Sequence, residues 1–183
     1  MKIEEIVCED ILDESLNRIL SMAKTHDFAI ITAYRFEENG IKLSVRQNII
    51  RNRNLRSTLD QNKLGAHPLV GHWQECTLSD VEYKDCPKDK LVDVIERSYF
   101  VTRPEKMSVN FFKNLLLSLA EQYNQNAIIL KIGKDINAVA ANGSIIQNLG
   151  THITLDKIGQ AYSQYVRNLN RPFIFERAKI NEI

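Results

Sequence analysis

The chain has 183 residues, a length that suits one domain with its own hydrophobic core. Its formal net charge of +1 gives no whole-chain argument for nucleic acid or a membrane surface as the partner, and we expect neither a secretion signal nor a membrane-spanning segment. Three cysteines, Cys8, Cys76 and Cys86, lack the count and spacing of a disulfide framework or a zinc module, so we expect a cytoplasmic protein without metal or cofactor.

The first half of the chain predicts a helix, a strand and a second helix, in that order. Apolar residues recur at helical spacing over residues 10–24, and the near-continuous apolar run 28–34 is typical of a buried strand. Ser44 is expected to begin the second helix, residues 45–62, because Gln47 completes a capping-box pattern with it.

The middle of the chain predicts two strands and a third helix. Gly65 is well placed to end the preceding helix, and strands are then expected near residues 69–75 and 96–102. The polar, charged stretch between these strands, at about 77–92, is interpreted as a surface insertion. The third helix, 109–123, is rich in Phe and Leu and is expected to be well buried.

The last part of the chain predicts a strand, a hairpin and a final helix. A buried strand is expected at 126–132, and a hairpin over 136–149 is expected because an Asn-Gly pair sits between its two apolar segments. Thr154 is expected to cap a helix over 155–169, with a short strand at 173–175 beyond it.

This order of elements predicts a single domain of the α/β (α+β) class over residues 1–183. We expect a mixed β-sheet with about four helices packed on it, not a regular βαβ winding. The segment 77–92 would be a polar insertion, and residues 134–183 would add a hairpin and a helix to the sheet.

The inward face of the second helix carries polar residues where apolar ones are expected. Val45, Asn48, Asn52, Leu55 and Leu59 share that face at 100° per residue. A buried amide without hydrogen-bond partners costs roughly 1–3 kcal/mol. The two asparagines therefore either bind backbone groups of neighbouring strands or line a polar cleft that meets a ligand.

Charged side chains suggest two further kinds of site. Arg46, Arg53 and Arg56 lie on one side of the second helix and could hold phosphate groups, although a solvated face that pairs with the acidic insertion is the alternative. His72 is a candidate proton shuttle, and Glu96 is a strong acid at the start of a predicted strand. The chain has no Gly-rich phosphate loop, nucleophile elbow or zinc-protease motif.

Five short patterns occur in order along residues 28–132. They are Ile31-Thr32-Ala33-Tyr34, Ser44-x3-Asn48, Gly71-x-Trp73-x-Glu75, Glu96-x-Ser98 and Tyr123-x-Gln125-Asn126-Ala127-Ile128. In this arrangement the chain resembles the small bacterial domain-of-unknown-function family 3293. The resemblance implies a shared α/β fold and a shared polar cleft. It would fit a member carried by a phage or another mobile element, which would act in the host cytoplasm.

Polar residues near the predicted strand ends suggest a ligand-binding rim beside Glu96. The candidate ligand-binding residues are Thr32, Asn48, Asn52, Ser98, Gln125 and Asn126. We expect a non-enzymatic binding protein that recognises a small polar ligand, a nucleotide or a protein partner. One alternative is an enzyme acting on a nucleotide or RNA with Glu96 or His72 as general base; another is a nucleic-acid binder using the three arginines.

Overall fold

The computed structural model describes residues 18–35, 37–76, 85–154, 161–165 and 168–176. This part of the chain forms one large β-sheet, a separate two-stranded hairpin, the helices α2 (Val45–Gln61) and α3 (Val109–Gln122), and a helical stretch over residues 18–25. Within these residues, no helix is both long enough and apolar enough to cross a membrane.

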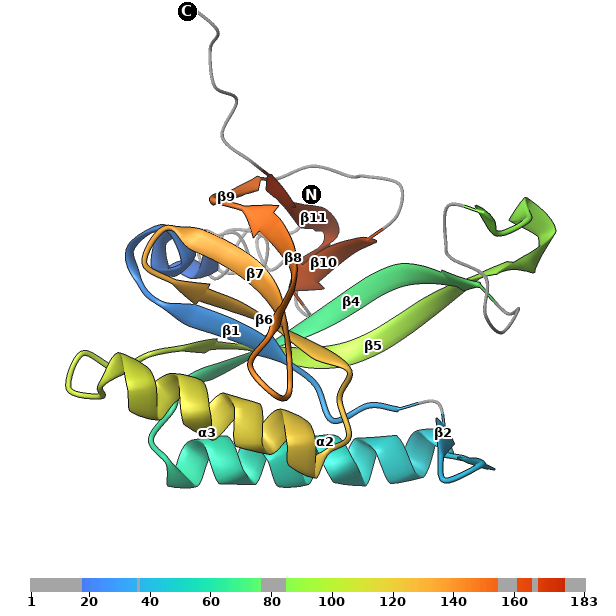
Figure 1. The fold of residues 1–183 in the computed structure, drawn as a ribbon, viewed down its shortest axis with the longest axis horizontal. Coiled ribbons are helices and arrows are strands. Elements are labelled where there is room, and N and C mark those ends of the chain that lie inside the picture. The colour runs from blue at the N-terminus through green and yellow to red at the C-terminus, as the bar shows by residue number, and fades with distance from the viewer. Residues whose placement is uncertain (1–17, 36, 77–84, 155–160, 166–167, 177–183) are drawn as a thin grey trace, which may run out of the picture.

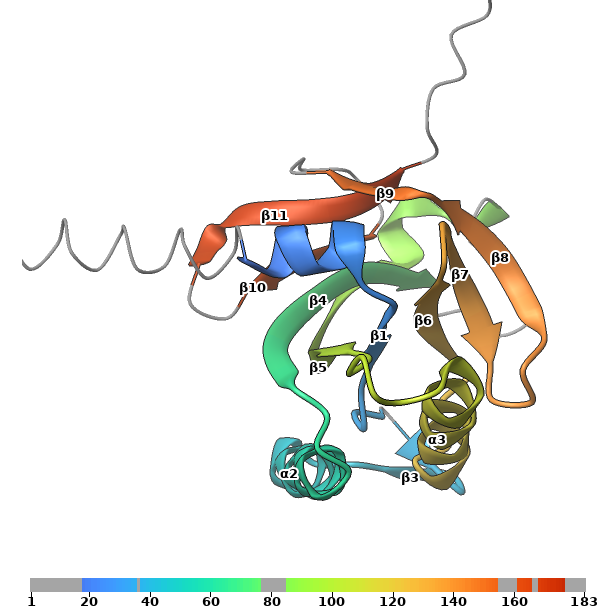
Figure 2. The same ribbon diagram turned by 90° about the vertical axis from the view of Figure 1, so that its left-hand side faces the viewer.

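The large sheet is antiparallel throughout its described pairs and curls back on itself. Its strands are β1 (Phe28–Ile31), β4 (Ala66–Cys76), β5 (Leu91–Thr102), β6 (Ala127–Ile132), β7 (Asp135–Ala140), β8 (Ile145–Gly150), β9 (His152–Thr154), β10 (Ala161–Tyr165) and β11 (Asn168–Glu176). They are ordered β8-β7-β6-β1-β5-β4-β10-β11-β9. Only Thr151 separates β8 from β9 along the chain, so the two ends of the sheet lie close together (Figure 2).

The two faces of β1 build two different cores, as the alternation of side chains along a strand requires. Phe28 and Ile30 pack with Ile19 and the rest of the helical stretch 18–25, which lies inside the curl of the sheet (Figure 2). The neighbouring residues Ala29 and Ile31 face the opposite way, into the core that α2 and α3 cover (Figure 1). All four residues of β1 are buried, which confirms a central strand here, but the strand ends at Ile31 and not at the predicted residue 34.

Capping residues define both ends of the two helices. Ser44 accepts a hydrogen bond from the Gln47 amide in the predicted capping box, and Ser108 caps α3 in the same position. At their C-terminal ends, both helices finish with a left-handed residue, Lys63 at φ 58° and Asn124 at φ 53°. The expectation that Gly65 ends α2 is therefore wrong by two positions, because Lys63 itself takes the strained conformation.

The predicted helix over 155–169 is wrong where the structure describes it. Residues 161–165 form β10, which pairs with β4 from Trp73 to Leu69, and residues 168–169 begin β11. Thr154 belongs to β9 and is paired with Ile174. Local helix propensity is a weak preference, and the open edge of β4 supplies a ladder of backbone partners that outweighs it. Part of that prediction, 155–160 and 166–167, lies outside the described residues.

The helix count and the sheet type also differ from expectation. The structure describes two full α-helices and the stretch 18–25, the end of the helix predicted over 10–24; residues 10–17 lie outside the described part. The sheet expected to be mixed is antiparallel in every described pair. The α+β class, helices α2 and α3, the strands near 69–75, 96–102 and 126–132, and the β7–β8 hairpin are confirmed.

The stretch expected as an insertion is partly strand. β4 and β5 pair without interruption from Ala66 opposite Val101 to Cys76 opposite Leu91, so the hairpin reaches further than predicted. Residues 77–84 lie outside the described part. Cys86 is disulfide-bonded, although the sequence analysis expected no disulfide framework. A single disulfide needs only two cysteines that the fold brings together, so a chain with three cysteines can still form one. A cytoplasmic location stays a prediction.

Candidate functional site

The chain leaves the sheet after β1, and side chains take over the hydrogen bonding of its backbone. The amide of Ala33 donates to Asn52 Oδ1 at 3.1 Å, and the carbonyl of Ala33 accepts from Arg51 Nε at 2.9 Å. The amide of Arg35 donates to Asn48 Oδ1 and its carbonyl accepts from Asn48 Nδ2, both at 2.9 Å. We call residues 33–35 the clamped segment.

The middle residue of the clamped segment is held in the same way. The amide of Tyr34 donates to Thr32 Oγ1 at 3.0 Å, and its carbonyl accepts from Gln125 Nε2 at 3.0 Å. All six backbone groups of this segment thus have side-chain partners, drawn from β1's end, from α2 and from the end of α3. Buried backbone groups must be paired, and here side chains do what a neighbouring strand does elsewhere.

The two asparagines on the inward face of α2 have structural partners. Asn48 and Asn52 are only 7% and 5% exposed, and Asn52 also donates to the carbonyl of Arg97 at 3.3 Å. Of the two alternatives for these amides, the structure shows backbone binding. A ligand contact by either side chain stays a prediction.

The other residues of the expected rim are spread over the same end of the sheet. Thr32 and Gln125 contact the clamped segment, as described above, and Ser98 is buried on β5 opposite Leu69. Glu96 lies two residues earlier on β5, opposite Gly71, and is partly buried. Asn126 is exposed at the start of β6. The side chain of His72 lies outside the described ones, so its role as a base also stays a prediction.

Of the three arginines expected on one side of α2, one is paired within the protein and two are exposed. Arg56 donates to both carboxylate oxygens of Asp60 at 2.9 Å and to the carbonyl of Ala66, and its guanidinium lies over the Tyr99 ring. Arg46 and Arg53 are exposed on the solvent side of α2. Only this pair is therefore open to a phosphate group.

A shallow cleft of about 400 Å³ lies beside the clamped segment, between the end of α3 and the small hairpin of β2 (Glu37–Glu38) and β3 (Ile41–Lys42). Its lining residues are Arg35, Glu38, Asn39, Glu121, Asn124, Gln125, Asn126 and Ala141. Among these, Asn39, Glu121 and Asn126 are exposed, and their side chains form no hydrogen bond with the residues that the structure describes. We call these three the open residues of the cleft.

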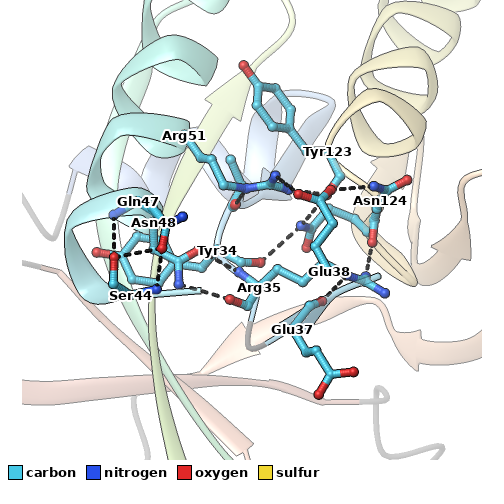
Figure 3. Close-up of polar contacts among 12 residues, drawn as sticks. Tyr34, Arg35, Glu37, Glu38, Ser44, Gln47, Asn48, Arg51, Tyr123 and Asn124 are labelled. Carbon is cyan, nitrogen blue, oxygen red and sulfur yellow. Dashed lines mark hydrogen bonds and ion pairs between the residues drawn. The ribbon is translucent and has the colours of Figure 1, made fainter. Parts of the chain in front are cut away.

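A charged network forms the wall of the cleft that the hairpin provides (Figure 3). Glu38 Oε2 accepts from Arg51 Nη1 at 2.9 Å, and Glu38 Oε1 accepts from Asn124 Nδ2 at 2.6 Å. The hydrogen bond from Asn124 and the charge of Arg51 hold the pKa of Glu38 below its usual value. Arg35 donates to the carbonyls of Glu37 and Asn124.

The two arginines of this network, Arg35 and Arg51, also donate hydrogen bonds to backbone carbonyls at the C-terminal end of α3. Arg51 Nη2 donates to the carbonyl of Tyr123 at 2.8 Å, and its guanidinium lies 5.7 Å from the centre of the Tyr123 ring. Cations are favourable at a helix C-terminus because the last carbonyls carry partial negative charge. The sequence analysis did not single out Arg51, Arg35 or Glu38. For Arg51 there was a signal, since it lies three residues after Asn48 on the edge of the same helix face.

The described residues contain no group of three or more His, Cys, Asp and Glu side chains that could hold a metal ion. The chain matches no protein-family model and no curated protein sequence. The resemblance to the domain-of-unknown-function family 3293 and an origin in a phage therefore stay predictions.

Proposed function

We propose that this chain is a non-enzymatic binding protein whose cleft beside α3 recognises a polar group of a protein partner or of a small polar ligand. One observation carries the proposal. Three open polar side chains, Asn39, Glu121 and Asn126, converge on a cleft whose other polar groups are already paired.

The cleft is suited to binding because the clamped segment beside it is held by many hydrogen bonds. The clamped segment has side-chain partners for all six of its backbone groups, and Gln125 of the cleft donates to Tyr34 and Tyr123 carbonyls at 3.0 and 3.1 Å. A preorganised site loses less conformational entropy when a ligand binds, so a few polar contacts yield more affinity.

The open residues also indicate what kind of group would fit. Two of them are amides, which offer a donor and an acceptor side by side, and the third is a carboxylate that accepts. Asn48 binds the amide and the carbonyl of a single residue, Arg35, in this same protein. Asn39 and Asn126 have the same chemistry and would suit the main chain of a polypeptide.

The lowered pKa of Glu38, which lines the cleft, favours ligand recognition over proton transfer. A general base or acid works best with a pKa near the working pH, whereas the pKa of Glu38 is lowered by Asn124 and Arg51. Glu38 is therefore an anion at neutral pH and serves as a hydrogen-bond acceptor.

The proposal is tested by affinity capture from an extract of the source cell, with captured protein, nucleic acid and small molecules all identified. The cleft variant combines Asn126→Ala with Glu121→Gln, and Asn54→Ala on the exposed side of α2 is the matched control. We expect a protein or a small polar molecule that the wild type and the control retain and the cleft variant loses at least fivefold. Equal retention by all three folded proteins would reject the cleft, and captured nucleic acid released by Arg46→Gln would favour the phosphate-binding alternative.

A further inference from the structure

The hairpin that carries Glu38 lies outside the large sheet. Among the described strands, β2 and β3 pair only with each other, through Glu37 opposite Lys42 and Glu38 opposite Ile41. A lone two-stranded hairpin is at best marginally stable in water. The side chain of Glu38 and the contact between the Glu37 carbonyl and Arg35 are among the groups that hold it against α2 and α3.

The groups that receive the Glu38 carboxylate come from two other elements. Arg51 belongs to α2, and Asn124 follows the last turn of α3. Each donates to a different oxygen of the same carboxylate, at 2.9 and 2.6 Å, which is how a protein binds the carboxylate of a separate molecule. The ion pair is partly open to solvent, with the side chains of Arg51 and Glu38 18% and 28% exposed.

Arg51 and the backbone of Asn124 are held in place without any help from Glu38. Arg51 is fixed by the carbonyls of Ala33 and Tyr123, at 2.9 and 2.8 Å. The backbone of Asn124 is held at the end of α3, where its carbonyl accepts from Arg35, whereas the only described hydrogen bond of its side-chain amide is the one to Glu38. If the Glu38 carboxylate left, the Arg51 guanidinium would remain in position, and the Asn124 amide would stay within reach of another carboxylate bound there.

We propose that Arg51 and Asn124 form a carboxylate-binding site, and that Glu38 is its internal occupant, displaced when a carboxylate of the ligand enters the cleft. This inference rests on the proposed function and names the chemistry of its ligand. The carboxylate would come from an acidic side chain or from the C-terminus of a polypeptide. Departure of Glu38 would also move Asn39, which lies at the tip of the hairpin and lines the cleft.

Competition between Glu38 and the ligand predicts how much the affinity should rise when the Glu38 carboxylate is removed. The apparent dissociation constant equals the intrinsic one divided by the fraction of molecules in which the site is empty. If Glu38 occupies the site about nine-tenths of the time, removing its carboxylate strengthens binding roughly tenfold.

The experiment is a titration of the full chain, followed by NMR chemical shifts, with three blocked tripeptides. Acetyl-Ala-Glu-Ala-amide carries only a side-chain carboxylate, acetyl-Ala-Ala-Ala with a free C-terminus carries only a terminal one, and acetyl-Ala-Gln-Ala-amide carries neither. We expect Glu38→Ala to bind at least one of the two acidic peptides about tenfold more tightly than the wild type. The neutral peptide should show no such gain.

Two further variants separate the site from general effects of charge and folding. Glu105→Ala removes an exposed carboxylate elsewhere and should not strengthen binding. Asn124→Gly removes the amide donor but suits the left-handed backbone at φ 53°, so it should fold and should cancel the gain when combined with Glu38→Ala.

Equal affinities of wild type and Glu38→Ala for both acidic peptides would overturn the inference, as would an equal gain for the neutral peptide or for Glu105→Ala. If the cleft variant still loses its captured partner in the preceding experiment, that result would leave the proposed function standing and reject only the carboxylate site.

Discussion

Replacing Asn48 with alanine tests whether the clamped segment depends on side-chain hydrogen bonds. In the wild type, this amide is 7% exposed and makes two hydrogen bonds of 2.9 Å, one to the amide and one to the carbonyl of Arg35. The alanine variant removes both bonds and supplies no replacement. Both backbone groups of Arg35 then lose their partners at a partly buried position.

The expected loss follows from two opposing terms. Each lost hydrogen bond lowers the free energy of unfolding by about 1–1.5 kcal/mol. Alanine is the better helix former, which returns roughly 0.5 kcal/mol. The net loss should be about 1.5–2.5 kcal/mol, or roughly 3–10 °C in the midpoint of thermal unfolding for a chain of this size.

The measurement is urea unfolding at pH 7, with Asn54→Ala as the control on the same helix. Asn54 is exposed and its side chain has no described hydrogen bond, so this variant should be as stable as the wild type or about 0.5 kcal/mol more stable. If Asn48→Ala came within about 0.5 kcal/mol of the wild type, the reasoning would fail, because the backbone of Arg35 would not need the amide.

Three other predictions follow from individual residues. Lys63→Gly should raise the free energy of unfolding by about 0.5–1 kcal/mol, because Lys63 has a φ of 58°; a Gly variant no more stable than Lys63→Ala would contradict this. The pKa of Glu38 is lowered from 4.5, so its contribution to stability is present above 4.5 and is lost as the pH falls through the lower folded value. The midpoints of thermal unfolding of the wild type and Glu38→Gln should therefore differ at pH 7 and converge in more acidic buffer. A difference at about pH 3 as large as that at pH 7 would refute this role of the Glu38 carboxylate. If the exposed Arg46 and Arg53 bind phosphate, changing both to Gln should abolish retention on heparin, and no retention of the wild type at low salt would end that alternative.

Sequence patterns predicted the parts of the fold that depend on local periodicity and on capping. β1 is a run of four buried residues, and α2 begins at a Ser44–Gln47 capping box, both of which can be read from short stretches of sequence. The two polar positions on the inward face of α2 were also recognised as unusual. Their partners were not predictable, because the clamped segment is irregular backbone and carries no periodic signal.

The parts that the sequence did not predict depend on contacts between distant segments. Residues 161–165 are a strand because β4 offers them a backbone partner about ninety positions earlier, and helical spacing in the sequence cannot report that. The pair of Glu38 with Arg51 and Asn124 joins three elements in the same way. The arginines of α2 could be listed from the sequence. Only the fold shows that Arg56 is paired with Asp60 and that Arg51 binds Glu38, a residue that lines the cleft.

The clamped segment connects the stability of the fold to the shape of the cleft. Arg35 is held at its backbone by Asn48, and its guanidinium reaches the hairpin at Glu37 and the end of α3 at Asn124. Arg51 holds the backbone of the same segment with one nitrogen and the Glu38 carboxylate with another. Because both arginines serve the fold and the cleft wall at once, loosening the segment should also loosen the wall. The polar residues on this helix face therefore have a use beyond packing. An apolar face would bury α2 equally well, but it would leave the backbone after β1, beside the cleft, without hydrogen-bond partners.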